Sequence, residues 1–84
     1  MLLNVYVLFD SKVEAFMQPF FLHSKGEAIR AFSDLANDVK TQVGKYPADF
    51  TLFHLGTFDS VDAKFDLLAT PMSLGLAIEF VKVS

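Results

Sequence analysis

Apolar residues occupy both faces of the first extended segment, residues 2–9. As a strand, this segment carries Leu3, Val5, Val7 and Phe9 on one face and Leu2, Tyr6 and Leu8 on the other. Successive side chains of a strand point to opposite faces, so the pattern predicts a strand in the middle of a sheet. Such a strand is either covered on both faces, or covered on one face and paired with a partner.

A turn and a second strand follow. The segment DSKVE, residues 10–14, begins with Asp and Ser, whose side chains bond local backbone amides in turns. Residues 15–22 then predict the second strand of a hairpin. Pro19 cannot donate a hydrogen bond to a neighbouring strand, so we expect this strand at a sheet edge or with a bulge.

A helix is predicted to begin at Ser24. Ser24 and Glu27 have the spacing of a capping box, in which the serine hydroxyl accepts from the Glu27 amide and the carboxylate accepts from the Ser24 amide. The apolar positions that follow form one helical stripe: Ala28, Ile29, Phe32, Leu35, Ala36 and Val39. Two helix ends fit the pattern, one at Asn37 or Asp38 and one with Gly44 as the C-cap.

The segment FTLFHLGTF has apolar residues on both faces and predicts a second central strand. Strict alternation places Phe53 and Leu55 on one face, and Phe50, Leu52 and Phe58 on the other. The helix covers one of these sets. We expect a second subunit to cover the other.

The C-terminal third completes the predicted fold. After a loop at residues 59–63, alternation over residues 64–68 makes a second hairpin. Residues 74–82 fit a helix or a strand, with a slight preference for a strand because of their β-branched and aromatic content. Residues 1–84 therefore predict a single α+β domain. In it, two β-hairpins flank one amphipathic helix in the order ββαββ plus a short C-terminal element, and the helix packs on one face of an antiparallel sheet.

Composition adds an expectation of self-association. Apolar residues make up 52% of the 84 residues and ten are Phe, more than a small domain hides easily, so we expect a homo-oligomer, a dimer or larger. Cysteine is absent, which fits a reducing, intracellular setting. No apolar run approaches the roughly 20 residues of a membrane span, and the start lacks a basic n-region. We expect a soluble, cytoplasmic protein that does not contact a membrane.

Candidate catalytic chemistry is sparse. His23 precedes the predicted helix cap and His54 lies between apolar neighbours, and no triad or set of three converging metal ligands accompanies either. Asp59 and Asp62 share a loop that lacks the spacing of a calcium loop. We expect no enzymatic activity, no cofactor and no metal.

The charge balance weakens a nucleic-acid interpretation. The net charge is −3, whereas proteins that grip nucleic acid neutralise phosphates with Lys and Arg. If the two hairpin loops lie at the same end of the sheet, their lysines form a small positive rim, and tyrosines near it can stack on bases. The candidate nucleic-acid-binding residues are Lys12, Lys25, Arg30, Lys64, Tyr6 and Tyr46. For Arg30, flanked by acids at helical spacing, a solvated helix face is the alternative.

Four segments resemble a known viral family: NVYVLFDSKVEAFMQPFF, SKGEAIRAFSDLAND, YPADFTLFHLGTFD and SLGLAIEF. In this order, and in a chain of this length, they resemble the nonstructural protein of gokushoviruses, single-stranded DNA phages of the Microviridae, known as the phage ORF5 or VP5 family. Members of that family tend to carry Gly after the acidic loop, where this chain has Ala63. Whether a left-handed turn residue persists there is open from the sequence.

The resemblance implies a nonstructural protein of bacteriophage DNA replication and packaging, located in the host cytoplasm and outside the mature virion. The expected activity is binding of single-stranded DNA as an oligomer. The alternative is a regulator that binds phage replication or capsid proteins and switches replication to packaging without contacting DNA. Salt separates the two, because phosphate contacts weaken steeply as salt rises and a hydrophobic interface does not.

Overall fold

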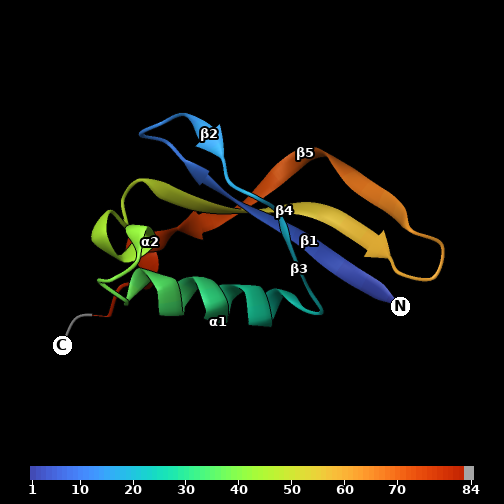
Figure 1. Cartoon of the computed structure of the whole chain (residues 1–84), viewed down its shortest axis with the longest axis horizontal. Coiled ribbons are helices and arrows are strands. Elements are labelled where there is room, and N and C mark those ends of the chain that lie inside the picture. Colours follow the sequence, from blue (N-terminus) through green and yellow to red (C-terminus); the bar gives the residue numbers. More distant parts are fainter. Residues whose placement is uncertain (83–84) are drawn as a thin grey trace.

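The computed structural model describes residues 1–82. Its elements are, in chain order, β1 (Leu2–Asp10), β2 (Ala15–Phe16), β3 (Phe20–Leu22), α1 (Lys25–Ala36), α2 (Gln42–Lys45), β4 (Phe50–Asp59), β5 (Lys64–Leu76) and the 3-10 helix η1 (Ala77–Phe80). Figure 1 shows the strands above α1, with the long β4–β5 hairpin extending beyond the helix.

The strands form one antiparallel sheet with β1 and β4 at its centre. The strand order is β2-β1-β4-β5, and β3 pairs with β1 on the same side as β2. Pro19 lies in the gap between β2 and β3, so the strand predicted for residues 15–22 is interrupted there and runs along a sheet edge. This is the behaviour expected of a residue without an amide hydrogen.

The α+β prediction, with two hairpins flanking one helix, is wrong. Strands make up 45% of the structure and helical segments 24%, and the strands form a single curled half-barrel sheet, so the fold is mostly β. The largest error lies in β5, which continues to Leu76 instead of ending at Leu68. Pro71 does not stop it, because residues 68–71 have no pairing partner on β4 and the missing amide costs no ladder bond.

The helix start is confirmed. The Glu27 amide donates to Ser24 Oγ at 3.2 Å, and the Ser24 amide donates to Glu27 Oε1 at 3.1 Å, so both halves of the capping box are present. α1 ends at Ala36 with Asn37 as its C-cap. The later end is therefore wrong, because Gly44 lies inside the separate helix α2.

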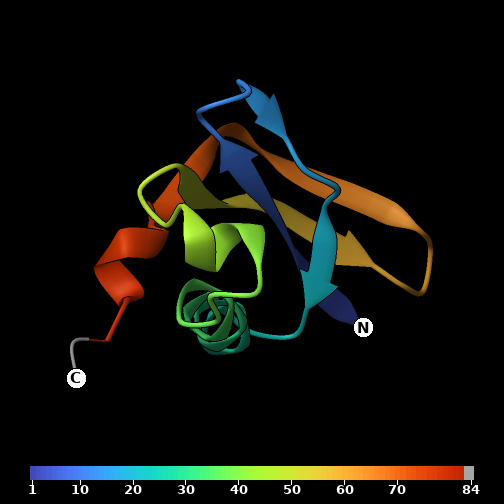
Figure 2. The same cartoon turned by 60° about the vertical axis from the view of Figure 1, so that its left-hand side comes forward.

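The core lies between α1 and the sheet. Figure 2 views α1 nearly end-on, below the strands. Its buried side chains are Ala28, Phe32 and Ala36. They share one cluster with Tyr6, Leu8, Phe50, Leu52, Val43 and Ala77. We call the side of the sheet that contributes Tyr6 and Leu52 the helix face.

The chain end returns to α1. For residues 74–82 the sequence fitted a helix or a strand. The chain remains a strand to Leu76 and then forms η1, so the preference for a strand is wrong for residues 77–80. Phe80 packs edge-on against Phe32 with ring centroids 5.6 Å apart. Asn37 holds the segment by donating from Nδ2 to the Phe80 carbonyl at 2.9 Å and accepting from the Lys82 amide at 2.7 Å.

Both hairpin turns end on a residue in the left-handed region. Glu14 has φ 57° and Ala63 has φ 61°. In each turn the opening aspartate accepts a backbone amide two residues on, Lys12 for Asp10 and Val61 for Asp59, at 3.0 Å. Ala63 thus adopts the left-handed conformation that Gly commonly has at the end of such a turn.

Ala63→Gly is expected to stabilise the chain. A residue with a Cβ is destabilised by roughly 1–2 kcal/mol in the left-handed region, and glycine avoids this strain. Glycine also raises the conformational entropy of the unfolded chain, which offsets roughly 0.5–1 kcal/mol of the gain. The net gain is about 0.5–1 kcal/mol, a rise in Tm of about 4 °C for a chain of this size. Thermal unfolding by circular dichroism measures it. The control is Ala48→Gly, at an exposed turn residue without positive φ, which should not raise Tm.

Candidate functional site

A β-bulge at Leu55 decides which side chains share a face of the sheet. Val5 pairs with Gly56 and the next residue, Tyr6, pairs with His54, so Leu55 is an extra residue on β4. The bulge shifts the alternation by one residue. Phe58 therefore lies on the same face as Phe53, and the predicted separation of these two side chains is wrong.

This face, opposite the helix face, gathers two sets of phenylalanines. Phe16 lies 4.8 Å from Phe9 and 5.9 Å from Phe53, measured between ring centroids. The second set is Phe21, Phe58 and Phe65. Between ring centroids, Phe21 lies 5.5 Å from Phe58 and 6.2 Å from Phe65, and Phe58 lies 4.8 Å from Phe65. Together the two sets define the phenylalanine face.

The sheet curls toward the phenylalanine face. Phe21 on β3 and Phe65 on β5 are separated by β1 and β4, which in a flat sheet means three strand spacings, about 14 Å. Their rings are nevertheless only 6.2 Å apart. The ring of Phe58 adjoins both. Gly56, in the neighbouring cross-strand row with Phe21 and Leu67, adds no side chain to this face. In Figure 1, β2 and β5 both rise on the side of the sheet away from α1.

The curl leaves an open, apolar trough. A cavity of about 300 Å³ is lined by Val7, Phe16, Met17, Pro19, Leu55 and Pro71, none of which is charged. Phe16, Phe21 and Phe65 remain 56%, 41% and 55% exposed. We call the phenylalanine face with this cavity the phenylalanine trough. It offers dispersion contacts and ring stacking, and no group for proton transfer or metal binding.

The predicted positive rim does not form. Because β1 and β4 are antiparallel, Asp10 pairs with Phe50 at one end of the sheet and Leu2 pairs with Asp59 at the other. The loops that carry Lys12 and Lys64 therefore lie at opposite ends.

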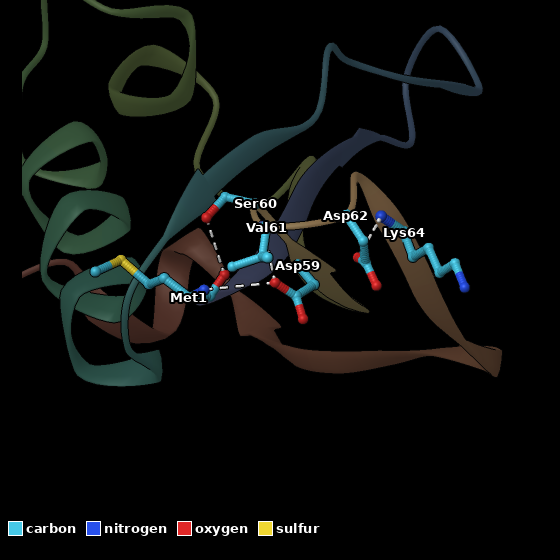
Figure 3. A network of polar contacts seen from close by, with 6 residues as sticks. All are labelled: Met1, Asp59, Ser60, Val61, Asp62 and Lys64. Carbon is cyan, nitrogen blue, oxygen red and sulfur yellow. Dashed lines mark hydrogen bonds and ion pairs between the residues drawn. The ribbon is translucent and has the colours of Figure 1, made fainter.

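The loop around Lys64 is held by hydrogen bonds from backbone amides to the side chains of its two aspartates. The Lys64 amide donates to Asp62 Oδ1, and the N-terminal ammonium lies 3.4 Å from Asp59, while the Lys64 ammonium extends away from both carboxylates (Figure 3). The hydrogen bond from the Val61 amide, with the nearby N-terminal ammonium, lowers the pKa of Asp59. The negative charge of Asp59 makes this loop a poor place for a phosphate.

Lys12 and Tyr46 are the two candidate residues that the structure brings together. They line one pocket of about 320 Å³ together with Asp10 and Asp49. Two carboxylates beside one ammonium give this pocket an unfavourable charge for a phosphate.

The remaining candidates lie on other surfaces. Tyr6 is only 1% exposed on the helix face, where burial and then the charge of Glu27 raise its pKa, so it is not available to stack on a base. Lys25 and Arg30 are exposed on α1, across the sheet from the trough. The six candidates therefore do not converge on one surface.

The histidines do not form a site either. Nε2 of His54 is buried without a hydrogen-bond partner, beside the Tyr6 ring at a centroid distance of 5.1 Å. His23 is exposed, and its carbonyl accepts from Asn4 Nδ2. Within residues 1–82 no three His, Cys, Asp or Glu side chains are placed to hold a metal ion together.

The trough is the feature that sequence reasoning missed. Pattern analysis assigned stacking to the tyrosines and used strict alternation through Gly56. An isolated glycine inside a strand pattern indicates a bulge or a close backbone approach, and Gly56 was the available signal. Taking a bulge there would have moved Phe58 to the face of Phe53.

No helix in the described part of the chain is long and apolar enough to cross a membrane.

Comparisons with known proteins identify the family. Searches of curated proteins and of solved structures found no significant match. The sequence profile of the family described as Phage ORF5 protein matches residues 3–80, nearly the whole chain. The chain therefore belongs to the Phage ORF5 protein family, a family of phage proteins.

Proposed function

We propose that this phage protein acts in single-stranded DNA synthesis and packaging in the host cytoplasm by binding proteins through the phenylalanine trough. The observation that supports it is the combination of large exposed aromatic side chains and uncharged lining residues in one concave surface. Its partners are phage replication or capsid proteins.

The energetics favour an apolar partner. Phe16 and Phe65 are about half exposed, so each offers on the order of 100 Å² of surface, and burying that area contributes roughly 2–3 kcal/mol. Aromatic anchors in a concave surface are typical of the residues that dominate protein interfaces. A DNA strand in the same trough brings phosphates to a protein of net charge −3 and finds no lysine or arginine among the residues that line the cavity.

Binding of single-stranded DNA is the second candidate, and the exposure of the rings favours it. Bases stack on exposed aromatic side chains, and each stacked base contributes about 1–3 kcal/mol. Phe16, Phe21 and Phe65 are open enough to accept such stacking. Binding of this kind depends on the Phe side chains and only weakly on salt, which separates it from the lysine-based interface that the sequence suggested.

The first test is a DNA titration. A labelled single-stranded oligonucleotide is titrated with wild type, with the trough variant Phe16→Ser plus Phe65→Ser, and with Lys12→Ala plus Lys25→Ala plus Lys64→Ala, at about 50 and 200 mM salt. We expect no change in anisotropy at either salt. Binding that is lost in the trough variant and insensitive to salt supports the second candidate, and binding that collapses with salt and in the lysine variant supports the lysine interface.

The second test concerns protein partners. The tagged chain is co-expressed with the capsid and replication proteins of the same phage, and the retained phage protein is identified. Wild type and the lysine variant should retain it, and the trough variant should not. Equal retention by all three contradicts the proposal.

A further inference from the structure

We infer that a second copy of this chain covers the phenylalanine trough in the free protein, so that self-association and binding of a phage partner compete for the same surface. This inference rests on the proposed function, because it names an occupant of the same site. The dimer is an addition to the proposed function, because it describes the protein before a phage partner binds.

The first argument is area. The exposed large apolar residues on or beside the trough are Phe16, Met17, Phe21, Phe65 and Leu67, at 41% to 59% exposure. At roughly 100 Å² each they offer on the order of 500 Å², and the cavity-lining Pro19, Pro71 and Leu55 add to this. The sum approaches the roughly 800 Å² that each partner buries in a standard interface. It also reaches the upper range of the roughly 300–600 Å² patches that monomers expose.

The second argument is self-complementarity. A two-fold dimer pairs the same patch on both subunits, so the surface must accept its own protrusions. The cavity lining combines both: Val7 is buried at 3% exposure, whereas Phe16 and Met17, on the β2 side, are 56% and 46% exposed. Two copies can therefore insert each edge into the other's trough. The cavity lining is uncharged, so this contact places no like charges against each other, although each chain carries a net charge of −3.

The third argument is the topology of the sheet. A half-barrel sheet has a convex and a concave face, and here the convex face packs on a helix. In a closed barrel the side chains of the concave face fill the interior. Here α1 covers the helix face. No helix of residues 1–82 belongs to the phenylalanine face, where Val5 and Val7 are buried but Phe16, Phe21 and Phe65 stay 41% to 56% exposed. A second half-barrel of the same curvature supplies the missing apolar layer.

The test is the mass in solution. Sedimentation velocity over about 1–200 μM should give wild type a mass near twice 9.4 kDa. The trough variant should sediment as a monomer with unchanged circular dichroism. The matched control is Val39→Ser plus Val61→Ser, which removes two exposed valines away from the trough and should remain dimeric. A monomeric wild type at 200 μM overturns the inference, as does a dimeric trough variant.

A cross-linking measurement keeps the inference testable if the trough variant does not fold. The chain has no cysteine, so single cysteines report proximity. Phe16→Cys should form an intermolecular disulfide under mild oxidation at least tenfold faster than Val61→Cys, and equal rates would contradict the inference. Different results contradict the two proposals. A monomeric wild type that retains a phage protein contradicts only the dimer. A dimeric wild type that retains no phage protein contradicts only the proposed function.

Discussion

Gly56→Ala is expected to lower Tm by about 15–30 °C. Gly56 has φ +149°, which L side chains rarely adopt, and an added Cβ would meet the Asp66 carbonyl oxygen and lie 2.7 Å from Leu67 Cα. Both obstacles are backbone of β5, so no side-chain rotation relieves them. Strain of roughly 1–3 kcal/mol adds to overpacking of roughly 1–3 kcal/mol. The sum, about 2–6 kcal/mol with a midpoint near 4 kcal/mol, is a large part of the stability of a small domain, and each kcal/mol corresponds to roughly 4–8 °C.

Thermal and urea unfolding measure this effect, and Gly26→Ala is the matched control. Gly26 is exposed in the first turn of α1, and the nearest atom to an added Cβ is Ser24 Oγ at 3.9 Å. Alanine there should be neutral or stabilise by up to about 1 kcal/mol, because it is the better helix former. A Gly56→Ala chain that melts within a few degrees of Gly26→Ala would show that β4 and β5 do not approach as closely as described.

The same substitution connects stability with the trough. Gly56 lies in one cross-strand row with Phe21 and Leu67, and the backbone of β5 approaches β4 closely at this residue. If some Gly56→Ala protein folds at low temperature, its trough should be opened. We then expect it to associate more weakly than wild type in sedimentation.

Local signals in the sequence predicted local structure correctly. Ser24 and Glu27 fixed the helix start, because a capping box is made by residues three apart and needs no tertiary contact. Pro19 interrupted an edge strand for an equally local reason, its missing amide hydrogen. The apolar positions Tyr6 and Leu8 were correctly placed on one face of a central strand.

The overall sheet could not be predicted in the same way, because it depends on pairing between distant segments. The bulge at Leu55 is defined only by the pairing of β4 with β1, and it moves every later side chain of the strand to the other face. β5 continues through Pro71, because this residue lies where β4 offers no partner. A pattern within one strand contains neither fact.

The candidate site failed for the same reason. A positive rim needed the loops of Lys12 and Lys64 at one end of the sheet, and the antiparallel pairing of β1 with β4 puts them at opposite ends. Of the residues that do gather, Phe53 and Phe58 were placed by alternation on opposite faces of a central strand, and Phe16 was predicted only as part of the second strand. Their role as an open surface follows only from the curl and from the absence of a second cover among residues 1–82.

The connection between α1 and α2 is the second place where a glycine is required. Thr41 Oγ1 accepts from the Gly44 amide at 2.9 Å and lies within donor distance of the carbonyl oxygens of Leu35 and Asp38, at 2.9 and 2.8 Å. These contacts hold the first turn of α2 directly against the end of α1. Val43, in the same turn, is buried in the core at 4% exposure.

Gly44→Ala is therefore expected to destabilise the chain by about 2–4 kcal/mol, although helix propensity alone would predict a gain of about 1 kcal/mol. An added Cβ would meet the Asp38 carbonyl oxygen and would lie 2.5 Å from its carbon and 3.0 Å from the Leu35 carbonyl oxygen. These are backbone atoms, so the turn must move and Val43 must leave its place in the core. Urea unfolding of wild type, Gly44→Ala and Gly26→Ala measures the sign directly. If Gly44→Ala raises stability as Gly26→Ala is expected to do, helix propensity outweighs packing here and the close contact of α2 with the end of α1 is wrong.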